Sequence, residues 1–393
     1  MAEFCFNTID LTDHGNQLLW LLYASPTPDG IIRILPVPST MDVLIVGAGS
    51  IGQKEIHELR DHPAVRIIGV VDEDETQLAA VSSTVPKTYN ELPEALGDTN
   101  PDLVRIATPP QTHHELAMIA LEADCDVYIE KIMTLDSGRA REIIETAEEY
   151  GKSVYVRRNG FYTPVYYKAW NEVDRLGEPR YVHWIEPVGE YSDWNRSKRA
   201  WLRDLPGGIV SEHLPHALYT VRWILQAEPA VEDVFYDSEE LHVSLTAGDK
   251  RARISYIRPS DYPMILDVVG SKGTIRIDHS TMRIHKPRGF ESARSVEWRT
   301  ARANVHDLFG SVKNLLRLSQ QYVRRELNLA ADPFYSQSDN YRQFTDIAND
   351  GEPSGGFRID GEEGLRNVRL FEEIWDRAEA NYSDSWKETT DLR

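Results

Sequence analysis

The sequence predicts an α/β protein with two unlike parts: a doubly wound parallel sheet, then an α+β domain with a largely antiparallel open sheet. A short apolar run at residues 42–46 leads directly into a glycine-rich turn. Strand-like and helix-like segments then alternate to residue 157, which forces parallel pairing with helices on both faces. Beyond residue 158 the strand-like segments follow one another without a helix between each, which favours antiparallel or mixed pairing.

In the first part, runs rich in β-branched residues predict strands and amphipathic runs predict helices. Strands are expected at residues 42–46, 65–71, 102–107, 127–129 and 154–156. Helices are expected at residues 53–60, 73–81, 91–96, 113–122 and 136–150. Gly151 follows the last of these helices in the position where a glycine commonly ends a helix.

The second part reads as consecutive strands with helices placed around them. Strands are expected at residues 181–186, 230–236, 241–246, 251–257, 264–269 and 274–277. Helices are expected at residues 164–175, 210–225, 311–327, 338–349 and 361–380. A largely antiparallel sheet with one open face is the arrangement that this order favours.

The domain boundaries follow from where the pattern changes. Residues 41–157 form the doubly wound domain, residues 158–380 the α+β domain for substrate binding and oligomerisation, and residues 381–393 a tail. Residues 1–40 have no clean period and carry turn residues. Two hypotheses stay open for them: translation starts at Met41, or they are a genuine extension packed on the domain edge. The intact mass of the native protein would decide between these.

Composition and charge exclude several classes of function. The chain has 393 residues with 43 basic and 63 acidic side chains, a formal net charge of −20, which argues against nucleic-acid binding. No apolar run approaches the ~18–20 residues that a membrane-spanning helix needs. Two cysteines cannot form a disulfide framework, so a reducing cytoplasmic location is expected.

Two surfaces suggest partners. The segment 311–327 is basic and amphipathic, and in so acidic a protein it more often covers a sheet edge or contacts a neighbouring subunit than a membrane. An open sheet must bury its second face, so a homo-oligomer, a homodimer or homotetramer, is expected.

The glycine-rich turn predicts a dinucleotide site. Residues 47–52 read Gly-Ala-Gly-Ser-Ile-Gly and fit the pattern GxGxxG between a strand and a helix. Gly47 would make the tight turn, Gly49 would let a pyrophosphate approach the backbone, and Gly52 would let the helix lie close to the strand. Asp72 ends the second strand, where a carboxylate accepts hydrogen bonds from the ribose and repels a 2′-phosphate. NAD is therefore favoured over NADP.

The motifs that follow carry a family likeness. The third strand is followed by Thr108-Pro109-Pro110 with His113 and Glu115, and the fourth strand is followed by Glu130-Lys131. Residues 159–164, Asn-Gly-Phe-Tyr-Thr-Pro, open the second part, residues 207–216 begin with Gly-Gly and end in His216, and residues 269–274 form a late glycine turn. In this order the motifs resemble the glucose–fructose oxidoreductase/inositol dehydrogenase/rhizopine-catabolism (Gfo/Idh/MocA) family, from residue 41 to about residue 380.

The resemblance implies a set of site residues. The catalytic positions are Lys131, Glu212 and His216. Cofactor contacts are implied for the following residues: Gly47, Gly49, Ser50, Ile51, Gly52, Asp72, Thr108, Pro109, His113, Glu130 and Lys131. Substrate contacts are implied for Lys131, Asn159, Glu212, His216 and Tyr219. No metal site is expected, although Glu212, His213 and His216 could also be read as a metal cluster.

The chemistry of these residues suits hydride transfer. Lys131 ends a parallel strand at the carboxyl edge and could stabilise alkoxide character as a hydroxyl loses its proton. His216 could accept that proton, and Glu212, one helical turn earlier, could orient the substrate or the imidazole. The sequence departs from the family pattern at Ile132, where the family has Pro, and at Glu212, where it has Asp.

We therefore expect an NAD-dependent oxidoreductase acting on a hydroxyl or carbonyl of a sugar, sugar derivative or cyclic polyol. Two alternatives remain at this point: a glycoside hydrolase or lyase that uses tightly bound NAD as a transient oxidant, and a non-catalytic sensor on the same fold. Net accumulation of NADH would distinguish the oxidoreductase from both alternatives.

Overall fold

The computed structural model describes residues 24–26, 32–34, 40–60, 62–158, 169, 172–187, 200–237, 240–257, 263–279, 283–285, 339–348 and 359–391. Asn159 and the predicted helix 311–327 lie outside the described residues. Of the predicted helix 164–175, only residue 169 and residues 172–175 are described, and the last of these enter a 3-10 turn, η1 (Asp174–Leu176).

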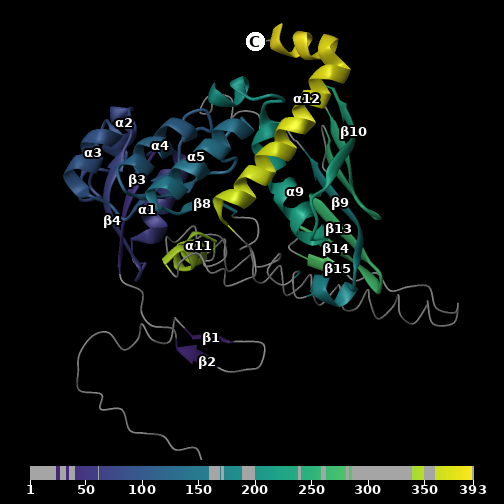
Figure 1. Ribbon diagram of the computed structural model, residues 1–393, viewed down its shortest axis with the longest axis horizontal. Helices are drawn as coiled ribbons and strands as arrows, with labels where there is room; N and C mark the ends of the chain where they lie inside the picture. The colour runs from purple at the N-terminus through teal and green to yellow at the C-terminus, as the bar shows by residue number, and fades with distance from the viewer. Residues whose placement is uncertain are drawn as a thin grey trace, which may run out of the picture.

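The first sheet is parallel throughout, as the alternating pattern predicted. Its strand order is β5-β4-β3-β6-β7-β8 (Figure 1). The bounds are β3 Met41–Val46, β4 Val65–Val71, β5 Thr88–Tyr89, β6 Leu103–Ile106, β7 Asp126–Ile129 and β8 Val154–Val156. Chain order reverses between β3 and β6, and in such sheets ligands bind at the carboxyl edge beside this reversal.

Helices cover both faces of this sheet because the apolar side chains of each strand alternate in direction. The helices are α1 Ser50–Leu59, α2 Glu75–Val81, α3 Leu92–Thr99, α4 His113–Glu122 and α5 Ser137–Tyr150. Val43 and Ile45 of β3 pack with residues of α1 and α2, whereas Leu44 and Val46 pack with residues of α3, α4 and α5. Gly151, with φ +65°, ends α5 as predicted.

A late segment of the chain returns to the first sheet. Helix α11 (Asp339–Ala348) packs on α1, and its Phe344 joins the core on that face of the sheet. The amide of Val156 donates to the carbonyl of Ile359 at 2.6 Å, and Tyr155 bridges to Asp360. Residues far beyond the sequence-based boundary at 157 therefore complete the packing of the parallel sheet.

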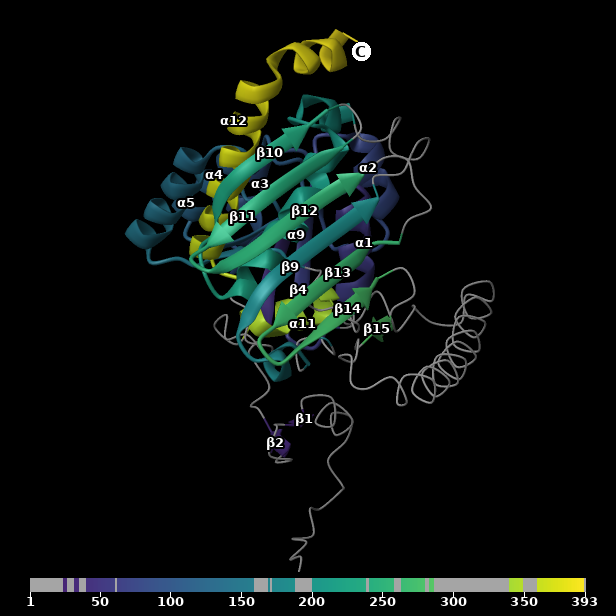
Figure 2. The ribbon, with the colours of Figure 1, turned by 90° about the vertical axis from the view of Figure 1, so that its right-hand side faces the viewer.

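The second sheet is mixed and mostly antiparallel, with strand order β10-β11-β12-β9-β13-β14-β15. Only the β12–β9 pair is parallel. The bounds are β9 Pro179–Pro187, β10 Ala230–Tyr236, β11 Leu241–Ala247, β12 Lys250–Ile257, β13 Ile265–Gly270, β14 Gly273–Asp278 and β15 Arg283–His285. Figure 2 shows this sheet face-on, with α9 and α12 behind it and none of the labelled helices in front.

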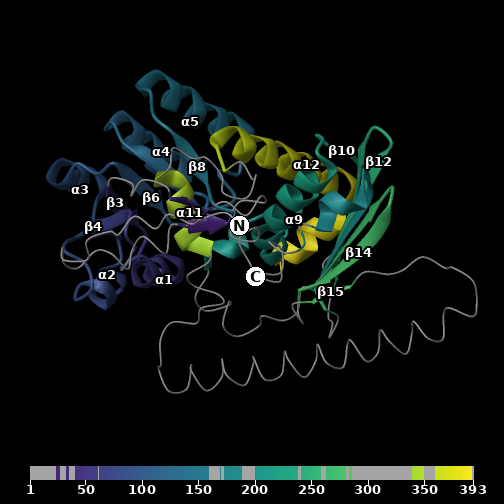
Figure 3. The same ribbon diagram turned by 90° about the horizontal axis from the view of Figure 1, so that it is seen from below.

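Two helices cover the inner face of the second sheet. Helix α9 (Ile209–Leu225) follows the 3-10 turn η2 (Ala200–Asp204) and packs on β9 and β12. Helix α12 (Gly361–Asp391) contacts α5 and β8 on one side and α9 and β10 on the other. Figure 3 shows α12 running between the two sheets. The two sheets are thus joined through one long helix rather than only through the chain connection.

The structure extends and corrects the predicted elements at several points. Helix α12 continues to Asp391, beyond the predicted end at residue 380, because no Gly or Pro follows Gly364 to break it. The short strands β5 and β15 were not predicted, because Thr88–Tyr89 and Arg283–His285 contain no run of apolar residues like those of the predicted strands. Within residues 1–40, Ala24–Pro26 and Ile32–Ile34 pair as the antiparallel strands β1 and β2. Among the described residues, no helix is both long enough and apolar enough to cross a membrane.

The glycine pair before α9 gives a stability prediction. Gly207 has φ +64°, and a Cβ there would lie 2.0 Å from the Trp375 ring of α12. Gly207→Ala should therefore lower the free energy of unfolding by about 1–3 kcal/mol in addition to the loss caused by backbone strain, because the buried indole cannot move away. Chemical denaturation followed by tryptophan fluorescence measures this loss.

Gly208→Ala is the matched control. Gly208 also has positive φ, +56°, but a Cβ added to it would meet nothing closer than 3.7 Å. This variant should lose only the roughly 1–3 kcal/mol of backbone strain. Equal losses in the two variants would show that the contact with Trp375 does not constrain the junction between α9 and α12.

Candidate active site

The glycine loop has the geometry that a dinucleotide needs. Gly47 has φ +104°, and a Cβ there would lie 2.7 Å from the carbonyl oxygen of Ala107. A Cβ on Gly52 would lie 1.9 Å from the carbonyl oxygen of Gly47, so only glycine lets α1 approach the strand. Gly49 has open space around its Cβ position, at the N-terminus of α1. The loop therefore leaves room for a pyrophosphate where the helix amides and dipole favour an anion.

Asp72 lies directly after β4 and braces this loop. Its Oδ2 accepts a hydrogen bond from the amide of Ala48 at 2.6 Å, and its Oδ1 accepts one from the amide of Asp74 at 2.9 Å. The carboxylate is half-buried at the edge. Each carboxylate oxygen has a second lone pair, so Asp72 can brace the loop and still accept from a ribose hydroxyl.

His113 lies inside the protein rather than at the surface of the edge. Its Nε2 is 2.9 Å from the carbonyl oxygen of Thr108, and its Nδ1 is 3.0 Å from that of Ile132. The side chain is fully buried, and burial lowers its pKa. His113 therefore joins the loop after β6 to the loop after β7. Thr108 and Pro109, in the first of these loops, are partly exposed.

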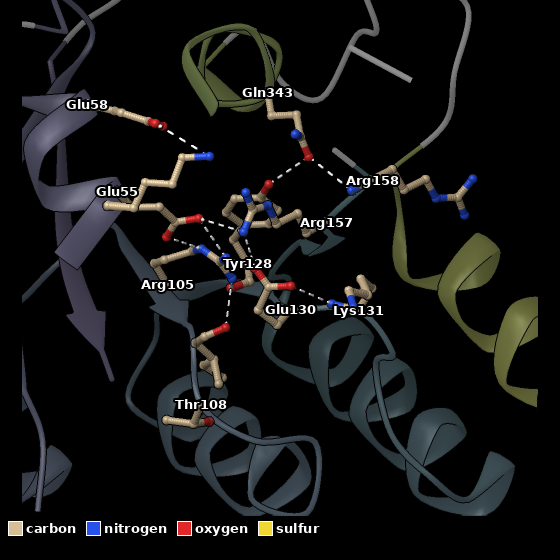
Figure 4. Close-up of polar contacts among 12 residues, drawn as sticks. Glu55, Glu58, Arg105, Thr108, Tyr128, Glu130, Lys131, Arg157, Arg158 and Gln343 are labelled. Carbon is tan, nitrogen blue, oxygen red and sulfur yellow. Dashed lines mark hydrogen bonds and ion pairs between the residues drawn. The ribbon is translucent and has the colours of Figure 1, made fainter. Parts of the chain in front are cut away.

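A buried ionic network lies beneath this edge (Figure 4). Arg105, in the middle of β6, donates from Nε and Nη2 to both oxygens of Glu55 on α1, each at 2.8 Å, and from Nη2 to Glu130 at 2.6 Å. Arg157, just after β8, also donates to Glu130. Two arginines and two glutamates thus balance one another in a space that excludes water.

The network fixes the charge state of Glu130. Burial alone would raise its pKa, but Arg157, Arg105 and the neighbouring Lys131 hold it far below its usual value. Burial raises the pKa of Tyr128 well above its ordinary value, so this phenol stays neutral beside Arg105. Its hydroxyl donates to Gln343 of α11 at 2.7 Å. The network therefore connects the returning C-terminal segment to the residue that precedes Lys131.

Lys131 and Glu212 meet across the two parts of the protein. The Nζ of Lys131 is 2.9 Å from Oε2 of Glu212 and 2.7 Å from its backbone carbonyl oxygen. Lys131 follows β7, and Glu212 lies in the first turn of α9. Two residues predicted for the site are thus in contact, although the sequence had suggested the substrate or the imidazole as the partner of Glu212. The extra methylene of Glu relative to Asp still allows contact with the lysine.

His216 faces the same site with a strongly altered acidity. Its Nδ1 lies 2.6 Å from the hydroxyl oxygen of Tyr219, whose own side chain is buried. Burial, the Lys131 ammonium and His213 together hold the pKa of His216 well below its usual value. The imidazole is therefore neutral at physiological pH and can accept a proton.

Of the predicted residues, the structure brings together Lys131, Glu212, His216 and Tyr219. The cofactor residues line the carboxyl edge near the β3/β6 reversal, with His113 and Glu130 buried behind it. No group of three or more potential metal ligands was found in the described part of the chain.

Sequence reasoning missed the ionic network and the carboxylate–imidazole pair of Glu186 with His213. The sequence did contain an indication of the network at Arg105, because a charged residue inside a buried parallel strand needs a buried partner. The sequence contained no indication that Glu186 pairs with His213, since the two residues come from different elements.

Comparison with known proteins agrees with this geometry. Residues 41–158 match the model of the GFO_IDH_MocA family, described as an oxidoreductase family with an NAD-binding Rossmann fold. This stretch of the chain is therefore similar to the NAD-binding part of the Gfo/Idh/MocA oxidoreductases. The stretch includes the glycine loop, Asp72 and Lys131.

Curated proteins that are similar to this chain include sugar and polyol dehydrogenases. The chain is 32% identical over 125 residues to D-xylose 1-dehydrogenase (NADP(+)) of Hypocrea jecorina, an alignment that spans 28% of this chain and 32% of that enzyme. It is 24% identical over 290 residues to inositol 2-dehydrogenase 3 of Saccharopolyspora erythraea, which covers 68% of this chain and 82% of the relative.

Solved structures share the fold over nearly the whole length. The WlbA dehydrogenase of Bordetella pertussis, solved with NADH and UDP-GlcNAcA, superposes with a TM-score of 0.64 at 19% identity, covering 88% of this chain and 98% of that one. The myo-inositol 2-dehydrogenase of Lactobacillus plantarum gives a TM-score of 0.65 at 15% identity, covering 87% and 98%. At these identities the structures establish the fold, including the mixed second sheet.

The ionic network gives a prediction about stability. Arg105→Met removes one of two buried cations and leaves Glu55 without its bidentate partner. We expect a loss of about 3–5 kcal/mol in the free energy of unfolding, the usual cost of breaking a buried pair from one side. Urea denaturation measures the change.

The double variant Glu55→Met with Arg105→Met restores charge balance, because Glu130 keeps Arg157. It should recover most of the stability lost in Arg105→Met. A double variant as unstable as the single one would mean that packing around Arg105, and not an unpaired carboxylate, causes the loss.

Proposed function

We propose that this protein is an NAD-dependent oxidoreductase that transfers a hydride to or from a hydroxyl or carbonyl group of a sugar, sugar derivative or cyclic polyol. The observation that carries the proposal is the contact between Lys131 and Glu212, which joins a cation to an acid at the carboxyl edge of the first sheet. The sugar and polyol dehydrogenases among the relatives support the substrate class. In this proposal residues 41–157 hold the cofactor and residues 158–380 supply most of the substrate side.

The nicotinamide supplies the hydride acceptor or donor when the cofactor is bound. The residues of this chain position the carbinol carbon and handle one proton. Lys131 is only 11% exposed, so its charge acts on a reacting oxygen with little screening by water. Its ammonium group would stabilise the negative charge that develops on that oxygen.

His216 would accept the hydroxyl proton during oxidation and return it during reduction. Its lowered pKa keeps the imidazole neutral, and Tyr219 occupies Nδ1, which leaves Nε2 for the substrate. Glu212 would orient the Lys131 ammonium and accept a hydrogen bond from a neighbouring substrate hydroxyl. Asn159 and Tyr219 remain proposals as substrate contacts.

The cofactor residues would act together at the edge of the sheet. Gly47, Gly49 and Gly52, with Ser50 and Ile51 at the start of α1, would hold the pyrophosphate, and Asp72 would hold the ribose. His113 and Glu130 would act through the loops and side chains they support rather than by direct contact, because both are buried. Thr108 and Pro109 would line the nicotinamide side.

The outer face of the second sheet is proposed as the contact for a homodimer or homotetramer. Figure 2 shows that none of the labelled helices covers this face, and Phe235 is 39% exposed on it.

We further propose a cytoplasmic setting without membrane or nucleic-acid contact. The buried Cys125 suits such a setting, since burial raises its pKa to about 11 and makes it unreactive.

Cofactor choice gives a prediction. The Asp72 carboxylate would repel a 2′-phosphate, so NAD should bind about tenfold or more tightly than NADP. Asp72→Ser should narrow this ratio, as measured by calorimetric titration with each cofactor. Glu73→Ser removes an exposed carboxylate from the adjacent position and should leave the ratio unchanged. A preference for NADP in the unaltered protein would contradict the proposed role of Asp72.

Catalysis gives a second prediction. Lys131→Ala should lower kcat for sugar or polyol oxidation by roughly 10²–10⁴-fold while NAD binding stays nearly intact, because the lost charge acts on the reacting oxygen. A panel of sugars and polyols followed at the NADH absorbance band provides the assay, with NAD titration and a melting curve alongside.

Lys152→Ala is the control, since Lys152 also pairs with a carboxylate, Asp124, at 2.8 Å but lies outside the site. Its turnover should match that of the unaltered protein. Normal turnover in Lys131→Ala would refute the mechanism. Product formation without any net NADH would refute net oxidation as the reaction.

A further inference from the structure

Beside the Lys131–Glu212 contact lies a second polar contact that the catalytic positions do not explain. Nδ1 of His213 lies 2.6 Å from Oε1 of Glu186, a residue of β9 on the second sheet. Glu186 is itself buried, and its other oxygen accepts a hydrogen bond from Nε1 of Trp184 at 2.9 Å. The carboxylate is thus fixed on both oxygens and can in turn fix the imidazole.

The other side of the His213 ring faces the catalytic pair. Its Nε2 is 3.9 Å from Oε2 of Glu212, the same oxygen that lies 2.9 Å from Nζ of Lys131. The order of groups is therefore Glu186, His213, Glu212, Lys131, with charges that alternate when the imidazole is protonated. Such a row has no net charge, and each member is held by an opposite charge beside it.

We propose that His213 is a positioning residue for the hydride-transfer site: as an imidazolium held by Glu186, it fixes the Glu212 carboxylate against the Lys131 ammonium. This inference rests on the proposed function, since it assigns a role within that same site. It adds two residues, His213 and Glu186, to those that the family resemblance implies.

The charges around His213 favour its protonated form. Burial alone would lower the pKa of His213 and Lys131 lowers it further, but Glu186 and Glu212 outweigh both, so its pKa is raised. The other titratable groups nearby are His216, whose ring contacts that of His213 at 6.5 Å between centroids, and Tyr256 of β12. Burial and the carboxylates of Glu186 and Glu212 raise the pKa of Tyr256 well above its usual value, so it stays neutral.

The pKa values of His213 and His216, one helical turn apart, are therefore shifted in opposite directions. His216 is neutral and suited to accept a proton, whereas His213 keeps its proton until the pH rises through its raised pKa. Both histidines should have the required charge state only at pH values between these two pKa values. Activity should fall on the acid side as His216 is protonated and on the basic side as His213 loses its charge.

The test combines three variants of the full-length protein with a pH profile of kcat/KM. His213→Gln should lower kcat/KM roughly ten- to a hundredfold at neutral pH, because Lys131 and Glu212 lose their support. Glu186→Gln should move the basic limb of the profile to lower pH, since it removes a carboxylate that stabilises the imidazolium. His213→Arg keeps a cation at every pH and should retain more activity than His213→Gln while losing that basic limb.

His114→Gln is the matched control. His114 also pairs with a glutamate, Glu142, at 2.8 Å, but on helices α4 and α5 of the first sheet. Its profile should match that of the unaltered protein. If His213→Gln has the same kcat/KM and the same profile as His114→Gln, the positioning role is overturned while the proposed function stands.

A direct titration separates the two levels of the inference. Histidine NMR signals of the cofactor-free protein, assigned with His213→Gln, should show His213 titrating above the usual range and shifting down in Glu186→Gln. A normal titration for His213 would overturn the charge row. A raised titration in a protein that turns over no sugar or polyol with either cofactor would overturn the proposed function and leave the charge row in place.

Discussion

The buried carboxylate of Glu130 is the constraint on which the site depends. It is held by Arg105 from the central strand β6 and by Arg157 from the end of β8, and its own backbone leads into Lys131. Because these side chains are buried, each charge in the network must stay paired, and removing any one partner would cost about 3–5 kcal/mol. The strand ends that carry the glycine loop and Lys131 are therefore fixed by electrostatics as well as by packing.

The same requirement reaches into the second part of the chain. Glu363 of α12 pairs with Arg158 at 3.4 Å and with Arg222 of α9 at 3.1 Å, so the connection after β8 is bound to both helices. Arg158 also lies over the ring of Tyr219, 5.6 Å from its centroid, and Tyr219 holds His216. Charged contacts thus link the carboxyl edge of the first sheet to helix α9, which helps to fix the distance between Lys131 and Glu212.

The site separates acid from base by environment rather than by residue type. Burial and the Lys131 ammonium lower the pKa of His216, whereas Glu186 and Glu212 outweigh the same two effects and raise the pKa of His213, although both histidines lie in one helix. The difference comes from Glu186 on the second sheet, which contacts only one of the two rings. A helix lying between a sheet edge and an open sheet can thus carry two imidazoles in different protonation states.

The sequence by itself determined the parallel sheet, the glycine loop, the place of Asp72 and the position of Glu212 and His216 on one helix face. These features depend on local spacing: period two in strands, 3.6 in helices and fixed glycine positions. It also indicated Lys131 through its place after a strand. Only the tertiary structure decided which charges meet. Glu55 with Arg105, Gln343 with Tyr128 and Glu186 with His213 join residues from separate elements, and no periodicity within one element specifies a partner in another. Burial then sets their protonation, a property of the folded surroundings that local sequence does not carry.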